Sequence, residues 1–304
     1  MLKKPNEIAV ALREAGRKKT QLSLDRMFVL GILAGVYIGF GAQLATTVSM
    51  DLSPKVGVGL SNFISGGAFS VGLMLVVLGG AELFTGNNLI WLSFLSRRSK
   101  ATAVLRNWST VFLGNFVGSI LLANLIFIGG FYTMGGNALG LRALTIANGK
   151  VNIGFIQLVA RGIVCNWLVC LAVWIATSAE DTTGKILACF FPIMTFVASG
   201  FEHSIANMFF IPIGILLKGV PNLVSQAGLD LQHLTWTGFL TRNLLPVTIG
   251  NVIGGGFFVA TLYWYVYLRP EARALDMIAE LNPATNETGQ VRILSWPRSR
   301  ELTE

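Results

Sequence analysis

The chain is 304 residues long, 53% of its residues are hydrophobic and only 12% are charged. A soluble domain carries about 25% charged residues, so this composition excludes an ordinary soluble enzyme, a disordered protein and a disulfide scaffold. It indicates a polytopic membrane protein. The net charge of +8 is concentrated toward the two ends of the chain, which is typical of the cytoplasmic flanks of a membrane protein and not of a nucleic-acid-binding surface.

The first 26 residues carry seven basic side chains interleaved with apolar ones, which predicts a short amphipathic cytoplasmic segment. Residues 27–268 are expected to form one six-span transmembrane domain, because their long charge-poor runs can cross a bilayer. The runs cover residues 27–50, 56–81, part of 107–141, 151–179, 186–217 and 243–268. The polar segment 269–304 is expected to be a largely disordered cytoplasmic tail.

The apolar run 83–96 has only 14 residues, which is too short to cross alone. If it did cross, the basic residues between 97 and 106 would lie opposite the basic N-terminus, against the positive-inside rule. We therefore join it to the preceding run as one long interrupted second span. Six spans place both termini in the cytoplasm, with 14 basic residues in cytoplasmic flanks and five in external loops, which predicts a multi-pass protein of the cytoplasmic (inner) membrane.

Two motifs occur twice, in the same order. The pattern G-x-E-x-x-x-x-N begins at Gly80 and again at Gly200, and a pattern R-N, six residues, G-N-x-x-G begins at Arg106 and again at Arg242. Each motif falls on corresponding spans of two three-span halves, and an odd number of spans per half inverts the second half in the membrane. Inverted repeats with interrupted helices, here the second and fifth, are typical of transporters and channels.

His203 lies in the interruption of the fifth span, and an ionisable group at that depth indicates a function. A histidine there can hand a proton to an entering anion, or its positive form can hold the anion. Thr85, in the first interruption, offers a hydroxyl to the substrate. Glu82 and Glu202 either orient the loop backbone and His203 or cap a half-helix.

Other polar residues within the spans leave two interpretations open. Asn115, Asn166 and Asn251 either line a pathway or hold helices together. Arg161 either collects anions in an external vestibule or pairs at a subunit contact. The three cysteines lie in apolar stretches without a histidine at metal-ligand spacing, and no nucleotide-binding or hydrolase pattern is present, so we expect no enzyme activity, no metal site and no cofactor.

At these residues the chain resembles the formate/nitrite transporter family. The resemblance covers about residues 5–268 and is carried by GGAELFTGN (79–87), NWLVCLAVW (166–174), FVASGFEHSIANMFFIP (196–212) and NLLPVTIGNVIGGG (243–256). It implies an all-α, aquaporin-like channel for small monovalent anions, assembled as a homopentamer in the lipid bilayer with one pore per protomer.

The resemblance also implies roles for individual residues. His203 matches the family's central histidine, Thr85 its loop threonine, and Lys150 a vestibule lysine. The full expected pathway is His203, Thr85, Asn166, Asn251, Lys150, Glu202, Asn207 and Arg161, with an outer constriction of Phe69, Phe196 and Val169 and an inner one of Leu73, Leu83 and Phe84.

The substrate is less defined than the family. Val151 to Ile153 stand where some formate channels carry two histidines, and Arg161 stands where some nitrite and hydrosulfide members carry a lysine, whereas the opening KPNEIAVALREAGRKK resembles formate transporters associated with formate dehydrogenase. We expect formate, with nitrite or hydrosulfide as the alternative. A neutral-solute channel of the water or glycerol type is the competing class, and it would gain little from His203.

Overall fold

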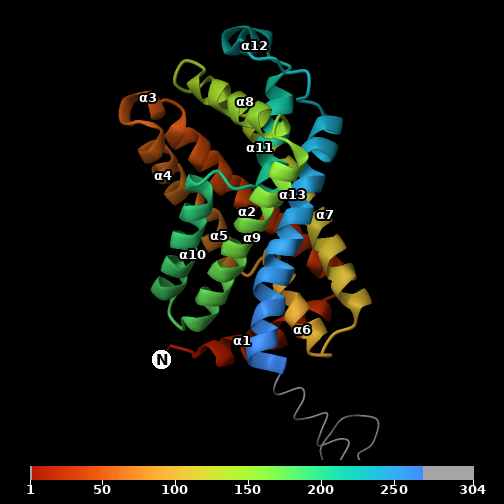
Figure 1. Cartoon of the computed structure of the whole chain (residues 1–304). Helices are drawn as coiled ribbons and strands as arrows, with labels where there is room; N and C mark the ends of the chain where they lie inside the picture. Colours follow the sequence, from red (N-terminus) through yellow and green to blue (C-terminus); the bar gives the residue numbers. More distant parts are fainter. Residues whose placement is uncertain (1, 270–304) are drawn as a thin grey trace, which may run out of the picture.

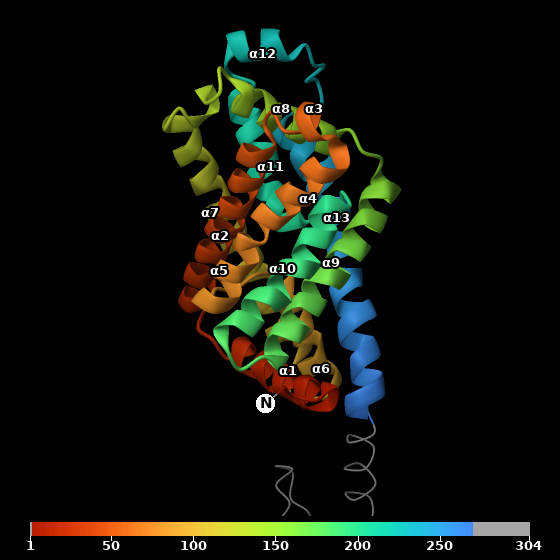
Figure 2. The same cartoon turned by 90° about the vertical axis from the view of Figure 1, so that its left-hand side faces the viewer.

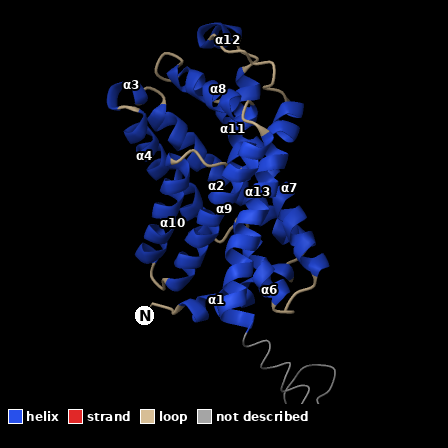
Figure 3. Cartoon of the chain, viewed as in Figure 1, coloured by secondary structure: helices blue, strands red, loops and turns tan. Residues whose placement is uncertain are grey.

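The computed structural model describes residues 2–269, and within that range the chain forms helices and loops without a strand (Figure 3). The tail predicted for residues 269–304 lies outside the described residues apart from Arg269. The long helices run roughly along one axis, with α1 and α6 at the lower end and α8 and α12 at the upper end (Figures 1 and 2).

The helices follow one another with short connections. In chain order they are α1 (Pro5–Thr20), α2 (Leu24–Ser49), α3 (Ser53–Val56), α4 (Val58–Phe69), α5 (Val71–Gly79), η1 (Gly86–Ile90), α6 (Trp91–Leu95), α7 (Ala101–Ile128), η2 (Phe131–Thr133), α8 (Ala138–Val151), α9 (Phe155–Ser178), α10 (Thr182–Ala198), α11 (Ser204–Leu217), α12 (Pro221–Ala227), η3 (Gly238–Leu244), α13 (Leu245–Val252), η4 (Ile253–Thr261) and η5 (Trp264–Leu268).

Among the described residues, five helices are long and apolar enough to cross a membrane. They are α2, α4 with α5, α7, α9 and the continuous helix Gly238–Leu268. The segment expected to form the interrupted fifth span is divided into α10 and α11, separated by residues 199–203, and α11 is followed by a bend of 107° into α12. Residues 83–96 do not form a span of their own, because they fold as a loop and the short helices η1 and α6, which pack on α1.

The amphipathic N-terminal segment is the helix α1. Pro5 occupies its first turn, the Glu7 carboxylate accepts a hydrogen bond from the Lys4 backbone N–H, and basic residues fill the last turn, which suits the helix dipole. Its apolar face, with Ile8 and Leu12, is buried against the lower end of the bundle. This helix is therefore part of the folded protein.

Both interruptions are closed in the same way. Gly80 ends α5 and Gly200 follows α10, each with φ of +73°, a backbone conformation that favours glycine. After each glycine the next N–H donates back into the preceding helix, from Ala81 to Val76 and from Phe201 to Phe196, both at 3.0 Å. The chain then leaves the helix and carries the repeated glutamate into the protein.

The helix pair α2–α7 and the pair of α9 with α13 and η4 pack at glycines. A Cβ atom on Gly118 would lie 2.0 Å from the Ile32 carbonyl oxygen, and one on Gly254 would lie 2.2 Å from that of Ile163. Such close backbone contact is the usual means of helix association in a bilayer. The two pairs hold the interrupted segments between them.

Candidate functional site

Glu202 is the centre of a buried polar network at the upper interruption. Lys150 Nζ lies 3.0 Å from both carboxylate oxygens, and Asn207 Nδ2 donates to one of them at 2.7 Å. Asn207 Nδ2 also donates to Asn243 Oδ1 at 2.7 Å, and Asn243 Nδ2 donates to the Lys150 carbonyl at 2.9 Å. The loop after α10, the end of α8 and the start of the last span are thus joined by one hydrogen-bonded network centred on this carboxylate.

Glu82 is the centre of a corresponding network at the lower interruption, formed by the same types of residue. Lys19 Nζ donates to its carboxylate at 2.7 Å, and Asn87 Nδ2 donates at 2.7 Å. Asn87 Nδ2 also donates to Asn107 Oδ1 at 2.9 Å, and Asn107 Nδ2 donates to the Lys19 carbonyl at 3.3 Å. The sequence motifs therefore correspond to duplicated contacts, next to α1 in one case and next to α8 in the other (Figure 1).

Lys19 was not singled out in the sequence. It lies 131 residues before Lys150, the same separation as between Gly31 and Gly162. Extending the repeat toward the N-terminus would have identified it. The duplication therefore includes the amphipathic helix that precedes each group of long helices.

An asparagine anchors each interrupted loop. Asn251 Nδ2 donates to the carbonyls of Gly162 and Glu202 at 2.9 and 3.0 Å, and its Oδ1 accepts from the Ser204 N–H at 2.9 Å. Asn115 makes the equivalent three bonds in the first loop, to the carbonyls of Gly31 and Glu82 and from the Phe84 N–H. Both side chains are fully buried, so each of these bonds is costly to lose.

His203 connects the two interruptions. Its Nε2 lies 2.9 Å from the Thr85 hydroxyl, and its Nδ1 accepts a hydrogen bond from the Ala206 N–H at 3.1 Å, which caps α11. Because Nδ1 accepts, the neutral ring carries its proton on Nε2 and donates it to Thr85 Oγ1. The Thr85 hydroxyl proton is then free to be donated to another acceptor.

Two cavities lie on either side of this contact. The α8-side cavity has about 230 Å³ and the α1-side cavity about 320 Å³. The α8-side cavity is lined by residues that include Ser49, Phe69, Arg142, Lys150, Phe196, Glu202, His203 and Asn207. The α1-side cavity is lined by residues that include Lys19, Leu73, Glu82, Leu83, Asn87 and Thr177.

Apolar side chains line both cavities beside the polar centre, and His203 itself lines the α8-side cavity. Phe69 and Phe196 pack edge to face with ring centroids 5.7 Å apart, and Phe196 stacks on the His203 ring at 5.8 Å. Leu73 and Leu83 line the α1-side cavity and are almost fully buried. All four are among the residues expected to form the constrictions, and that role stays a prediction.

The other two expected constriction residues, Phe84 and Val169, do not line these two cavities. The Phe84 ring packs edge to face on Phe112 and Trp108, with centroid distances of 5.0 and 6.2 Å, and does not line either cavity. Val169 is buried in the core without lining a cavity. Phe84 follows Leu83 directly, so their side chains leave the loop in different directions.

Asn166 and Arg161 line neither cavity. Asn166 Nδ2 donates to the carbonyls of Thr85 and Asn251 and to Asn88 Oδ1, which holds the first loop against α9 and the last span. Arg161 does not line the α8-side cavity, and its side chain is exposed on the surface of the protomer. The Asn166 contacts are those of a residue that holds helices together.

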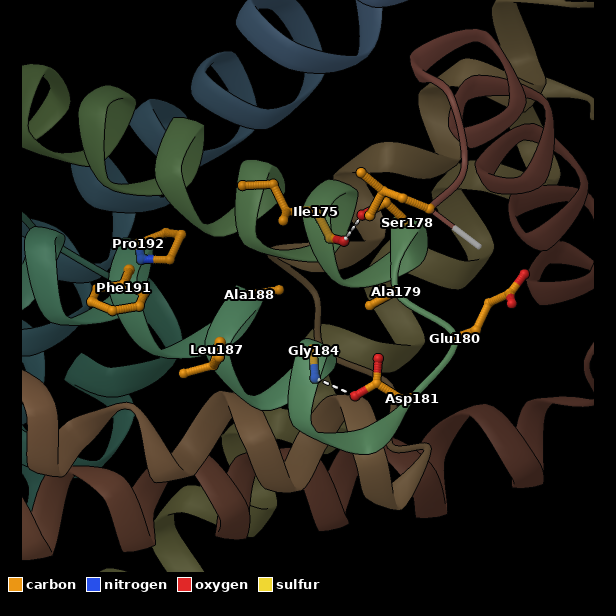
Figure 4. Close-up of a pocket in the computed structure, with 11 residues that line it drawn as sticks. Ile175, Ser178, Ala179, Glu180, Asp181, Gly184, Leu187, Ala188, Phe191 and Pro192 are labelled. Carbon is orange, nitrogen blue, oxygen red and sulfur yellow. Dashed lines mark hydrogen bonds between the residues drawn. The ribbon is translucent and has the colours of Figure 1, made fainter.

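A cavity of about 820 Å³ lies at the α9–α10 turn (Figure 4) and shares no lining residue with the other two. Its polar groups have internal partners: Asp181 accepts from the Gly184 N–H at 2.7 Å and the Ser178 hydroxyl donates to the Ile175 carbonyl at 2.6 Å. The rest of its lining is mostly aliphatic, so it offers little to an anion.

Comparisons with known proteins agree with this architecture. The formate/nitrite transporter family model matches residues 6–265. The chain is 42% identical over 284 residues to the probable formate transporter of Methanothermobacter thermautotrophicus, with 88% of this chain and 98% of that protein covered. It is 40% identical over 272 residues to the formate channel FocA of Escherichia coli K12, with coverage of 87% and 94%.

A solved structure described as a pentameric formate channel with formate bound is also similar. Its TM-score is 0.73 at 38% identity, and the match covers 81% of this chain and 98% of that chain. The similarity in sequence and in fold extends over nearly the whole of each relative. The chain therefore belongs to the formate/nitrite transporter family of membrane transport proteins.

Proposed function

We propose that this chain forms a channel for formate in the cytoplasmic membrane. The observation that carries the proposal is the buried Thr85–His203 contact, which lies between two cavities and beside apolar side chains. The named formate channels and transporter among the relatives support formate as the substrate. The solved relative's pentameric state supports a homopentamer with one pathway in each protomer.

The proposed membrane arrangement has six spans in two inverted halves, with α10 and α11 together forming the fifth. The duplicated glutamate networks next to α1 and α8 support it. The excess of basic residues in the predicted cytoplasmic flanks supports cytoplasmic termini. The α8-side cavity is then external and the α1-side cavity internal.

Passage of formate requires a way to reduce the cost of moving its charge past apolar side chains. An unpaired carboxylate is very costly to transfer into an apolar environment, whereas its neutral acid is not. Formate that reaches the centre can accept the Thr85 hydroxyl proton as a hydrogen bond. His203 can pass a proton in that direction only when another proton enters at Nδ1 and displaces the Ala206 N–H, so we expect passage to respond to pH.

Flux into liposomes containing the purified protein tests this proposal. Formate, nitrite, hydrosulfide and glycerol are offered separately at pH 5.5 and 7.5. Formate is expected to cross fastest and to show a clear pH response. If nitrite or hydrosulfide crosses fastest, that anion replaces formate as the proposed substrate and the proposed site is unchanged. Passage of glycerol alone would contradict the anion mechanism.

A further inference from the structure

The two cavities differ in charge although their networks are duplicated. The α1-side cavity is lined by one cation, Lys19, and one carboxylate, Glu82. The α8-side cavity is lined by two cations, Arg142 and Lys150, and one carboxylate, Glu202. With His203 neutral, the α8-side cavity therefore carries one positive charge more than its counterpart.

The additional charge belongs to Arg142, because Lys150 is neutralised by Glu202. Lys150 contacts both Glu202 oxygens at 3.0 Å. Arg142 Nε donates to the Ser49 hydroxyl at 3.2 Å, and none of the described carboxylates forms an ion pair with the guanidinium. Burial alone lowers the pKa of Arg142 from its ordinary value, and the group remains charged at physiological pH.

Arg142 is also the part of this arrangement that the repeat does not contain. It lies two helical turns before Lys150 on the same face of α8, with Ile146 between them, and all three line the cavity. The equivalent position, eight residues before Lys19 on α1, is Ala11. The glutamate network at the α1 side forms without a cation there, so folding of the network does not require Arg142.

We propose that Arg142 captures the anion at the entrance of the α8-side cavity. This inference rests on the proposed anion-channel function and adds a specific binding residue to it. The terminal nitrogens of the guanidinium can donate two parallel hydrogen bonds to a planar carboxylate such as formate. The neighbouring hydroxyls and the Lys150–Glu202 pair lead from this point to Phe69, Phe196 and the His203 centre.

Initial rates of uptake as a function of anion concentration test the proposal. They are measured in right-side-out and inverted membrane vesicles from cells that have no other formate pathway, with formate, nitrite and glycerol. Arg142→Gln is expected to raise the half-saturating concentration of both anions roughly five-fold, or about 1 kcal/mol, for entry from the α8 side only. Entry from the α1 side and glycerol uptake remain unchanged. The difference in half-saturating concentration between Arg142→Gln and the unmodified protein becomes smaller as ionic strength rises.

Three control variants distinguish an effect of the Arg142 charge from an effect on the local structure. Arg142→Lys keeps the positive charge and is expected to retain most of the affinity. Ser49→Ala removes the hydrogen bond to Arg142 and keeps the charge, so its half-saturating concentration for the anions is expected to rise much less than that of Arg142→Gln. Lys55→Gln removes an exposed cation that is paired with Asp51 at the same end of the molecule, and it has no effect.

The outcomes distinguish this inference from the proposed function. An unchanged concentration dependence in Arg142→Gln overturns the inference while leaving the channel function intact. A defect in Ser49→Ala equal to that in Arg142→Gln overturns it also, since the role would then be structural. Uptake of nitrite but not formate by the unmodified protein refutes the assignment of formate as the substrate, and the role of Arg142 is then tested with nitrite. Uptake of glycerol alone refutes both the anion-channel function and the role of Arg142.

Discussion

His203 has one hydrogen bond on each ring nitrogen, and the two bonds have different roles. The Ala206 N–H occupies Nδ1 and fixes the ring at the start of α11, whereas Nε2 reaches across to Thr85 on the other interruption. A residue with one of these contacts alone would serve as a helix cap or as a polar bridge. Together they place a single transferable proton between the two cavities.

Replacing His203 with asparagine removes this proton and keeps a polar side chain that can cap α11. We expect the variant to assemble normally and to lose formate flux at pH 5.5 by roughly a factor of ten, since proton transfer by a positioned group is lost. Flux between pH 5 and 8 is the measurement. The matched control is His233→Asn, because His233 is the other histidine of the chain and lies outside the cavities. An unchanged profile in His203→Asn would exclude the proposed role.

Composition alone could not place two of the cavity residues, for a shared physical reason. Lys19 lies in a segment that composition assigns to a cytoplasmic flank, and Arg142 lies in one that it assigns to an external loop. Whether a lysine or arginine on such a helix faces water or a cavity depends on how the helix docks, which charge counts do not contain. Phe84 shows the same limit, since its neighbour Leu83 lines a cavity and it does not.

At the scale of elements, α1 and α8 perform equivalent tasks with different degrees of burial. Each ends near a lysine that pairs with a glutamate of the adjacent interruption. The Lys150 and Glu202 side chains are 16% and 5% exposed, whereas those of Lys19 and Glu82 are 34% and 7% exposed. The α8 pair is therefore screened less by solvent.

Removing the cation from each pair tests this difference. We expect Lys150→Met to lower the free energy of unfolding by about 3 kcal/mol, since it leaves a buried charge unpaired. Lys19→Met costs about 1 kcal/mol because its pair is more exposed. Thermal unfolding midpoints in detergent provide the comparison, and the double variant Lys150→Met with Glu202→Gln is expected to recover part of the loss. A larger decrease for Lys19→Met would contradict the ranking.

For the whole molecule, much more of the helix arrangement than of the candidate site could be predicted from the sequence. Hydropathy and bilayer thickness act locally on the chain, so charge-poor runs located the long helices, and the repeated G-x-E motif located both interruptions at Gly80 and Gly200. The separate helix α8 was not predicted, because residues 138–151 are only moderately apolar and were divided among the run 107–141, a loop and the start of the fourth span. That these residues form a separate helix depends on their contacts with α11 and the last span.

The position of Arg161 is relevant to how the protomers assemble. Its carbonyl accepts the Glu202 N–H at 3.3 Å, so it lies level with the interruption of the fifth span, and its side chain is exposed on the surface of the isolated protomer. A charged side chain that faced lipid at that depth would cost at least about 2.5 kcal/mol. We therefore expect another protomer to cover it.

Arg161→Leu is expected to reduce the fraction of pentamer in detergent at low protein concentration, while flux per assembled pentamer stays the same because Arg161 does not line the α8-side cavity. Native mass spectrometry gives the first quantity and liposome flux the second. Arg26→Leu is the control, since Arg26 is exposed near the start of α2, where its charge can reach water. Normal assembly with reduced anion flux in Arg161→Leu would show instead that Arg161 acts on the pathway, and would leave the subunit contact to other residues.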